Sequence, residues 1–215
     1  MIVSREPVIK FIKKLGSRVF TTRDIAAISG KSVSTVVQGL KHLQQQGVVV
    51  KLYRGIWAER GKEPISPLSL LPSLPGGHRT YVSFTTALHI HGMIEQIPRD
   101  ITCATLAHSR LIRSAVAVFS LHTISPDFFF GFDWYKQTGE FLIASPEKAI
   151  LDCFYCAGRK NRNFGYLPEL SIPDKFDINK ARSWTERIHD SRLRKHVQNR
   201  FDGLILATRQ PHRPD

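Results

Sequence analysis

The chain has 215 residues, of which 42% are hydrophobic, with a formal net charge of +13 and a pI of about 10.0. This length and hydrophobic fraction are typical of a globular protein with one large domain or two smaller ones. No apolar run is long enough to span a bilayer, the N-terminus lacks the pattern of a secretion signal, and the three cysteines do not suit a disulfide framework. We therefore expect a cytoplasmic protein.

The positive charge is concentrated at the two ends of the chain. The net charge is +8 over residues 1–60, −1 over residues 61–157 and +6 over residues 158–215. A basic segment that coincides with a DNA-binding motif indicates a nucleic-acid partner. The basic residues do not follow one face of an amphipathic helix, which disfavours a membrane surface as the partner.

The first predicted element is an amphipathic helix over residues 5–15, with Pro7 near its first turn. Its apolar positions are Val8, Ile9, Ile12 and Leu15, and its outward positions are Lys10, Lys13 and Lys14. A short strand is predicted at residues 19–21. We expect the helix to cover the back of the elements that follow.

Two helices joined by a glycine turn come next. The first spans Arg23–Ser29, Gly30 supplies the left-handed backbone of the turn, and Ser32 is suited to cap the second helix, which runs to about Gln46. The apolar stripe of the second helix is Val33, Val36, Val37, Leu40 and Leu43, and its other side carries Ser34, Thr35, Gln38, Lys41 and Gln45. Gly39 lowers helix stability by roughly 1 kcal/mol relative to alanine and indicates close approach of another backbone.

A basic β-hairpin completes this region. Residues 48–53 are rich in β-branched residues, Arg54 and Gly55 form a turn, and Ile56–Trp57 begin the return strand. The order helix, turn, helix and hairpin predicts a winged helix-turn-helix, whose second helix enters the major groove while the hairpin lies on the phosphates. Small helical domains with a hairpin also dock proteins, so that alternative stays open.

Residues 59–77 contain four prolines and three glycines, which is typical of a connector. We therefore predict a winged helix-turn-helix DNA-binding domain over residues 1–58, a connector over 59–77 whose leucines attach to one of the domains, and a second domain over 78–215. The expected fold class is α+β, with a mixed α+β second domain that ends in a basic helical region.

Within the second domain, strands are predicted at residues 101–106, 116–124 and 140–143, and a helix over 85–94, after Tyr81–Phe84, is capped by Ser83 or Thr85. Another helix opens with Ser145 at its N-cap, Pro146 at its first position and Glu147 against its positive end. The basic, Asn-rich loop 159–166 precedes one long helix over residues 177–201, and residues 207–215 are expected to fray.

At this point the chain resembles a known family, the AbiEi antitoxins, which are the regulator halves of bacterial type IV toxin–antitoxin systems. The resemblance rests on VFTTRDIAAISGKSVSTVVQGLKHLQQQGVVVKLYRGIWA, YVSFTTALHIHGMIEQIPRDITCAT and FLIASPEKAILDCFY, in that order, with a less distinctive basic C-terminal region. It implies a transcriptional repressor that binds inverted repeats at its own promoter, with antitoxin activity in the second domain. It also implies functional pairing with a nucleotidyltransferase-like toxin, without a stable complex.

For three further groups of residues, we favour a structural role over a chemical one. Cys153 and Cys156 have redox or metal spacing, but one helical turn apart they are expected in the core. His89 and His91 diverge on a helix, which disfavours a metal site there. The aromatic cluster Phe128, Phe129, Phe130, Phe132, Trp134 and Tyr135 either packs a core or stacks on bases, the core being favoured.

We expect no enzyme, cofactor or metal. No phosphate loop or nucleophile elbow is present, Lys148 is expected to be exposed or paired with a phosphate, and the nuclease-like set Asp127, Asp133, Glu140 and Glu147 fits no known spacing. An adaptor that binds protein through its second domain is the main alternative to a DNA-binding regulator, and an RNA-directed enzyme is a more distant one.

The predicted DNA contacts fall into two groups. Ser34, Thr35, Gln38 and Lys41 would face bases or nearby phosphates, and Thr22, Lys31, Ser32, Lys51 and Arg54 would lie along the phosphates. Arg54 at the hairpin tip could also enter a minor groove. Further candidates are Arg159, Lys160, Arg162, Arg192, Arg194 and Lys195, for which a solvated helix face is an equal alternative.

Overall fold

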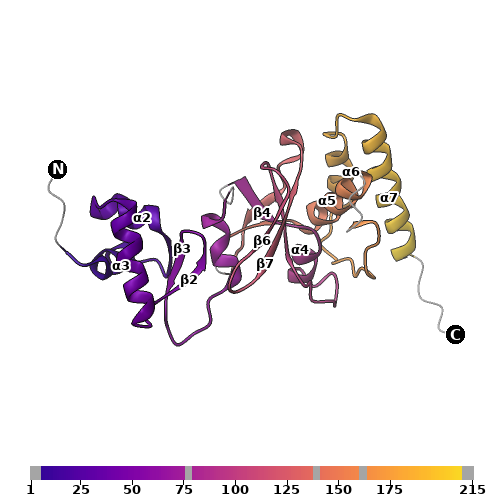
Figure 1. Cartoon of the computed structure of the whole chain (residues 1–215). Helices are drawn as coiled ribbons and strands as arrows, with labels where there is room; N and C mark the ends of the chain where they lie inside the picture. The colour runs from indigo at the N-terminus through magenta and orange to yellow at the C-terminus, as the bar shows by residue number, and fades with distance from the viewer. Residues whose placement is uncertain (1–5, 76–78, 138–140, 160–163, 210–215) are drawn as a thin grey trace. The chain divides into compact units, whose positions relative to one another are not determined.

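A computed structural model describes residues 6–75, 79–137, 141–159 and 164–209 (Figure 1). The chain divides into two compact units, the first formed by Met1–His78 with Arg113–Ala117 and the second by Arg79–Ile112 with Val118–Asp215. Both units combine helices with a β-sheet. The α+β class predicted from the sequence is therefore confirmed.

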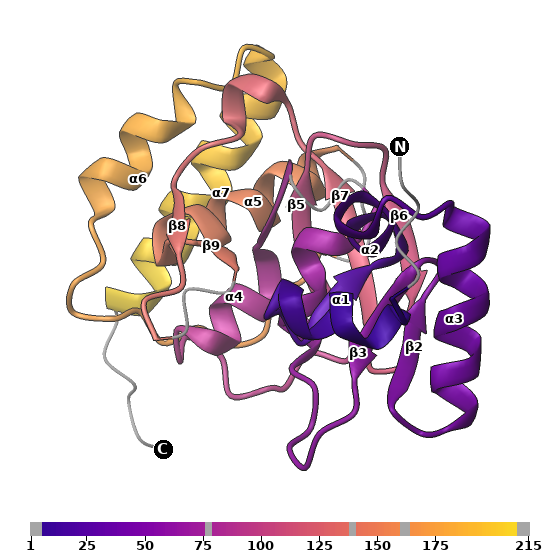
Figure 2. The same ribbon diagram turned by 90° about the vertical axis from the view of Figure 1, so that its left-hand side faces the viewer.

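The first unit consists of three helices and a small antiparallel sheet. Its elements are α1 (Val8–Leu15), β1 (Val19–Thr21), α2 (Thr22–Ser29), α3 (Val33–Gln45), β2 (Val49–Tyr53) and β3 (Ile56–Glu59), followed by the 3-10 helix η1 (Pro67–Ser73). The strand order is β1-β3-β2, so β3 is central. Figures 1 and 2 show α3 beside the hairpin of β2 and β3, within this unit.

Local signals in the sequence determine how the helices begin and end. Thr21 and Asp24 form a capping box at α2, in which the Thr21 hydroxyl accepts from the Asp24 amide and the Asp24 carboxylate accepts from the Thr21 amide. Gly30 ends α2 with a φ of 65°. The Ser32 hydroxyl then accepts from the Thr35 amide at the start of α3. The predicted bounds of these two helices are confirmed to within one residue.

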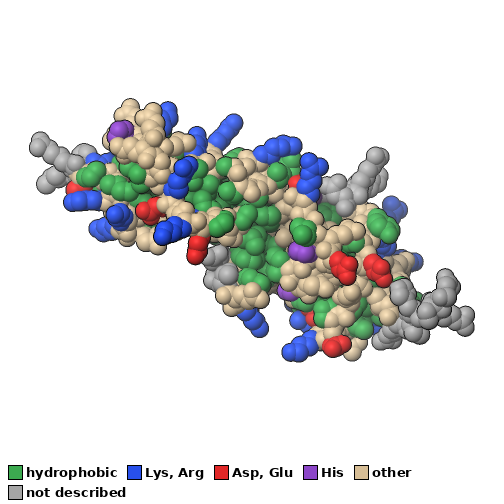
Figure 3. Space-filling view, turned by 90° about the horizontal axis from the view of Figure 1, so that it is seen from below, with side chains coloured by type: hydrophobic (Ala, Val, Ile, Leu, Met, Phe, Trp, Pro, Cys, Tyr) green, Lys and Arg blue, Asp and Glu red, His purple; other side chains and the backbone are tan. Residues whose placement is uncertain are grey.

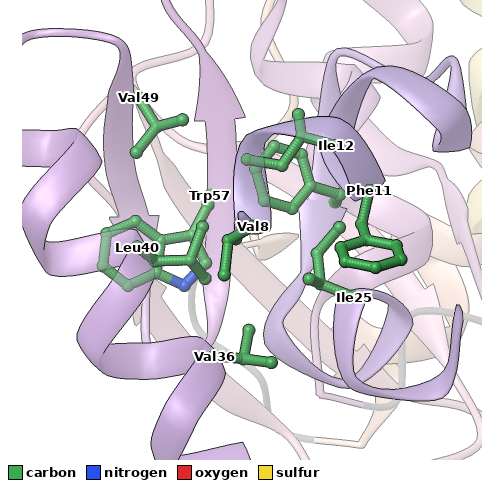
Figure 4. Close-up of a cluster of buried hydrophobic side chains, with 9 residues drawn as sticks. Val8, Phe11, Ile12, Ile25, Val36, Leu40, Val49 and Trp57 are labelled. Carbon is green, nitrogen blue, oxygen red and sulfur yellow. The ribbon is translucent and has the colours of Figure 1, made fainter. Parts of the chain in front are cut away.

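The core of the first unit lies between the three helices and the sheet (Figure 4). Its buried side chains are Val8, Phe11, Ile12, Phe20, Ile25, Val36, Leu40, Val49 and Trp57. Val33 was predicted in the apolar stripe but is 53% exposed, because the first residue of α3 lies beyond the sheet-facing side. A Cβ atom on Gly39 would lie 2.6 Å from Val8 Cγ2, so this glycine accommodates a side chain of α1 and not a backbone.

The predicted connector is partly regular. Residues 67–73 form η1, which packs against β1, and Leu70, Leu71 and Leu74 are buried. Pro67 occupies the first position of η1, where the backbone amide has no intrahelical acceptor in any case. The burial of these leucines agrees with the prediction that the connector is attached to one of the domains.

The second unit is built on a six-stranded mixed sheet with the order β6-β7-β5-β4-β9-β8. Its strands are β4 (Thr80–Val82), β5 (Ile101–Thr105), β6 (Arg110–Arg113), β7 (Val118–Thr123), β8 (Phe132–Trp134) and β9 (Leu142–Ala144). β5 pairs with β7 and β4 with β9 in parallel, while β4–β5 and β8–β9 are antiparallel. The strands β6 and β8 were not predicted, because each is short and mostly solvent-facing.

The helices of the second unit are α4 (Phe84–Ile90), α5 (Pro146–Gly158), α6 (Ile178–Thr185) and α7 (Ser191–Arg209), with the short 3-10 helix η3 (Pro126–Phe128). α5 packs against both α4 and α7. α5 has the predicted cap, since the Ser145 hydroxyl accepts from the Lys148 amide, and Pro146 is its first residue. Neither Ser83 nor Thr85 caps α4 through its side chain; Ser83 is the N-cap residue, but its hydroxyl bonds elsewhere.

The long C-terminal helix predicted over residues 177–201 is in fact two helices. α6 ends at Thr185, and α7 begins at Ser191 and continues to Arg209, into the stretch expected to fray. The Asp190 carboxylate accepts from the Leu193 amide, which caps a new helix in the middle of the predicted one. Residues 210–215 and Glu140, which was predicted in a strand, lie outside the described residues.

A charged and hydroxyl network lies in the core of the second unit. Lys148 and Asp152 are completely buried and form an ion pair on α5, and the Asp152 carboxylate also accepts from Tyr81 Oη at 2.9 Å and Ser83 Oγ at 2.7 Å. Lys148 Nζ lies 3.8 Å from the centre of the Phe128 ring. Lys148 is therefore neither exposed nor available to a phosphate, contrary to the prediction. Its partners can hold a buried ammonium because they neutralise and solvate it.

Most of the aromatic cluster packs inside the second unit. Phe132 stacks on Tyr81 with ring centres 4.4 Å apart, and Phe128 stacks on Tyr155 at 4.8 Å. Trp134 is the exception at 55% exposed. The favoured prediction of a core is confirmed for Phe128, which is fully buried.

Candidate nucleic-acid interface

The outward side of α3 is a continuous polar surface. Ser34, Thr35, Gln38, Lys41 and Gln45 are all exposed, while Val36 and Leu40 on the opposite side are fully buried. The 100° rotation per residue of an α-helix places Gln38, Lys41 and Gln45 within roughly 60° of one another. Two predicted contact residues, Gln38 and Lys41, thus share one side of α3 with Gln45 and present amide and ammonium donors that base edges and phosphates can accept from.

The start of α3 carries a cluster of hydroxyl groups. Ser32 Oγ lies 2.9 Å from Ser34 Oγ and 2.8 Å from Thr35 Oγ1, and it also accepts from the Thr35 amide. These contacts fix the three side chains relative to the helix. Each hydroxyl has one donor and two acceptor positions, so exposed members of the cluster can still bond outward.

The hairpin of β2 and β3 carries two cationic side chains, Arg54 and Lys51. Arg54 is exposed in the turn between β2 and β3, where Gly55 has a φ of 72°. Lys51 Nζ lies 5.7 Å from the centre of the Trp57 ring. The Trp57 indole nitrogen donates to Thr22 Oγ1 at 3.0 Å, which fixes that ring in the core. The two cations are therefore held on a hairpin anchored to the helices, and Lys31 lies half-buried at the start of α3.

Thr22 does not have the predicted role. Its side chain is 5% exposed, its hydroxyl accepts from Trp57, and its amide donates to the Gly55 carbonyl at 2.8 Å. The neighbouring Thr21 and Asp24 amides are satisfied by the capping box. These amides at the start of α2 therefore donate to acceptors within the protein. We remove Thr22 from the candidate contacts.

Among the other arginines of this unit, Arg18 and Arg23 differ in availability. Arg18 donates to the backbone carbonyls of Glu63 and Pro64, which ties down the chain after β3. Arg23 is exposed in the first turn of α2 and was missed by the sequence analysis. Its position in the first turn of α2, the helix preceding α3, is visible in the sequence. Figure 3 shows Lys and Arg side chains standing out from the surface on the side of the N-terminal unit.

The candidates in the second unit separate into different environments. Arg159, Arg192 and Lys195 are exposed, while Arg194 is paired with Glu186 at 3.4 Å. Arg159 and Arg192 line one cleft, which Lys195 does not. Lys160 and Arg162 lie outside the described residues.

The cysteines and His91, which the sequence analysis considered for redox or metal chemistry, are packed or hydrogen-bonded within the fold. Cys153 and Cys156 are buried, and burial raises the pKa of both thiols, that of Cys156 to about 12. His91 Nε2 is 2.7 Å from the Ala144 carbonyl oxygen, which it can reach as a donor. Within the described residues, no group of three or more His, Cys, Asp or Glu side chains is arranged to hold a metal ion.

The carboxylates considered for a nuclease are engaged in the fold where they are described. Glu147 accepts from Ser145 Oγ at 2.6 Å and from the Asp177 amide at 3.1 Å, which links α5 to the start of α6. Asp127 lies 3.2 Å from His189 Nε2. Asp133 is exposed and bonds to the next backbone amide. These residues do not converge on one site.

Comparison with known proteins shows a similarity within the first unit. Residues 7–60 match the family model described as "Transcriptional regulator, AbiEi antitoxin". A search of curated proteins gave no match. In the part of the chain that the structure describes, no helix is both long enough and apolar enough to cross a membrane. The matched segment runs from α1 to just beyond β3, so the resemblance to the AbiEi antitoxins seen in the sequence is confirmed for residues 7–60.

Proposed function

We propose that the first unit is a winged helix-turn-helix that binds duplex DNA, with α3 in the major groove and the β2–β3 turn as the wing. The element order α1-β1-α2-α3-β2-β3, the glycine turn after α2 and the antiparallel hairpin after α3 support this assignment. The observation that carries it is the exposed polar side of α3 next to a cationic hairpin, within the residues that match a regulator family.

The proposed contacts follow from exposure and chemistry. Gln38 would pair with a base edge, since its amide can both donate and accept, and Lys41 would bind a base or a nearby phosphate. Ser32, Ser34 and Thr35 would contribute hydroxyls at the start of α3. Lys31, Lys51 and Arg54, joined by Arg23, would neutralise phosphates beside the groove.

We further propose that the protein is a repressor of its own promoter and the antitoxin of a type IV toxin–antitoxin pair. The AbiEi-like family of the first unit supports a regulator with antitoxin function. Inverted repeats would present the same site to two copies of the chain. A nucleotidyltransferase-like toxin would be its functional partner without a stable complex, and the chain would not be an enzyme.

A substitution at Gln38 tests this assignment. Gln38→Ala should lower the affinity for the DNA upstream of the protein's own gene by about tenfold, since a lost bidentate base contact corresponds to roughly 1–3 kcal/mol. Affinity for a scrambled duplex should change little. Fluorescence anisotropy with both duplexes measures the two effects.

The matched control is Gln44→Ala, which makes the same change at an exposed position roughly 120° around α3 from Gln38. The control should bind both duplexes as the wild-type protein does. Equal behaviour of the two variants would remove α3 from the recognition surface and favour a protein-docking role for this unit.

A further inference from the structure

The second unit contains a cleft that the proposed DNA-binding function does not use. It has a volume of about 850 Å³ and lies between the C-terminal end of α5, the first part of α7 and the segment from the end of β7 to η3. This volume is typical of small-molecule sites, which span roughly 300–1,000 Å³. Figure 1 shows α5 and α7 close together at the orange and yellow end of the chain.

The wall of the cleft is strongly cationic. It includes the guanidinium groups of Arg159, Arg187 and Arg192. Its one acidic lining residue, Asp190, uses a carboxylate oxygen to accept from the Leu193 amide and thereby caps α7. Within the described residues, none of the three arginines forms an ion pair with a carboxylate. The cleft therefore has uncompensated positive charge.

Two of these arginines are held by aromatic rings and not by acids. Arg187 lies with its guanidinium carbon 4.2 Å from the centre of the Phe130 ring. Arg159 lies 5.7 Å from the Tyr155 ring, and its Nη1 is 3.5 Å from the Tyr155 hydroxyl. Stacking orients a guanidinium while leaving most of its N–H groups available. Such groups bind phosphate oxygens in pairs.

A buried polar atom in the same wall lacks a partner. His196 lines the cleft, and its Nε2 is buried without a hydrogen-bond partner among the described residues. α7 can approach α5 this closely because Gly158 has no side chain: a Cβ there would lie 2.8 Å from His196 Cδ2.

We infer that this cleft is a nucleotide-binding site. Arg159, Arg187 and Arg192 would hold a chain of phosphate groups, which also lie near the positive N-terminal end of α7. The apolar wall formed by Ile124 and Leu193 would receive the base and sugar. The phosphates can belong to a free nucleoside triphosphate or to the 5′-triphosphate end of an RNA chain. The inference does not depend on DNA binding by the first unit.

Isothermal titration of the full chain with ATP, inorganic tripolyphosphate and adenosine tests the site. ATP and tripolyphosphate should bind saturably and adenosine should not, because the arginines supply most of the attraction. Arg159→Gln and Arg192→Gln should each weaken ATP binding by about tenfold, as expected for loss of a bidentate phosphate contact. The matched control is Lys195→Gln, which removes one charge from an exposed position on α7 outside the cleft and should change ATP binding less than twofold.

Two short single-stranded RNAs of one sequence, with a 5′-triphosphate or a 5′-hydroxyl, distinguish the sources. Tighter binding of the triphosphate RNA than of ATP assigns the site to an RNA end, and tighter binding of ATP assigns it to free nucleotide. Absence of saturable binding by ATP, tripolyphosphate and triphosphate RNA would overturn the inference. An equal loss in Arg192→Gln and Lys195→Gln would also overturn it, since only a diffuse basic surface would remain. Arg54→Ala should leave ATP binding unchanged, which separates this site from the DNA interface.

Discussion

At the residue scale, the residues that lie in environments unusual for their type are those that contact residues far away in the sequence within the same unit. Lys148 is buried because Asp152 neutralises it and because Tyr81 and Ser83 bond to the same carboxylate. Burial lowers the pKa of Lys148 and raises that of Asp152, while their mutual attraction acts in the opposite direction. The spacing of four residues between Lys148 and Asp152 is visible in the sequence, but their hydroxyl partners lie about 70 residues earlier.

Gly39 provides a stability test of such a contact. On helix propensity alone, Gly39→Ala should stabilise α3 by about 1 kcal/mol. The new Cβ would lie 2.6 Å from Val8 Cγ2, and overpacking of this kind typically destabilises by about 1–3 kcal/mol. We therefore expect a net decrease in the free energy of unfolding, measured by chemical denaturation.

The control for Gly39 is a double-mutant cycle with Val8→Ala. That background lacks the Cγ2 contact of 2.6 Å and keeps a Cβ contact of 3.2 Å, so Gly39→Ala should destabilise the protein much less there than in the wild-type background. A loss of stability of the same size in both backgrounds would show that Val8 is not the reason for the glycine.

His122 makes a pH-dependent prediction. Its side chain is 7% exposed, and desolvation by burial lowers its pKa from 6.5 to about 4. Between these values the unfolded chain binds a proton that the folded chain does not, so stability falls as the pH decreases through this window. From pH 7.5 to pH 5 the loss should be roughly 1–2 kcal/mol.

Denaturant titrations at the two pH values measure the effect of His122. His122→Gln removes the titrating ring, so this variant should lose less stability on acidification than the wild-type protein does. The same pH dependence in both proteins would contradict the assignment of the proton to this residue.

At the element scale, the sequence predicts structure wherever the signal is local. The capping serines, the glycine after α2 and the proline at the start of α5 place helix boundaries correctly, because caps involve neighbouring residues. The break between α6 and α7 was missed because helical spacing of apolar residues continues across it. β6 and β8 were missed because each is stabilised by pairing with other strands and not by its own pattern.

The same reasoning explains which site residues were predictable. The exposed side of α3 follows from helical periodicity, so Gln38 and Lys41 could be assigned from the sequence. The burial of Thr22 could not, because it depends on Trp57, which is 35 residues away. The cleft in the second unit also required the fold, since Arg159 follows α5 and Arg192 lies in α7, 33 residues further along the sequence.

The proposed role of the hairpin in DNA binding can be tested with a substitution at Arg54. Arg54→Ala should weaken DNA binding and reduce the slope of log affinity against log salt by about one, as expected for the loss of one phosphate contact. Lys13→Ala makes the same charge change on exposed α1 and should leave the slope unchanged. Binding measured over a salt series gives both values. An unchanged affinity and slope in Arg54→Ala would exclude the wing from the interface.

At the scale of the whole molecule, the two units carry separate proposals. The family match covers the first unit, whose polar helix and cationic hairpin support binding to DNA. The second unit holds the basic cleft, whose arginines lie directly after α5, between α6 and α7, and in the first turn of α7. The positive charge at both ends of the sequence thus belongs to different surfaces, one for each unit.

The most direct test of the central claim is a mobility-shift titration of the full chain with the DNA upstream of its own gene and with a scrambled duplex, across a salt series. A sequence-specific regulator should prefer its own DNA and retain that preference near physiological salt, because base contacts are less sensitive to salt than phosphate contacts. Equal binding to both duplexes that disappears as salt rises would contradict the claim and leave only a basic surface.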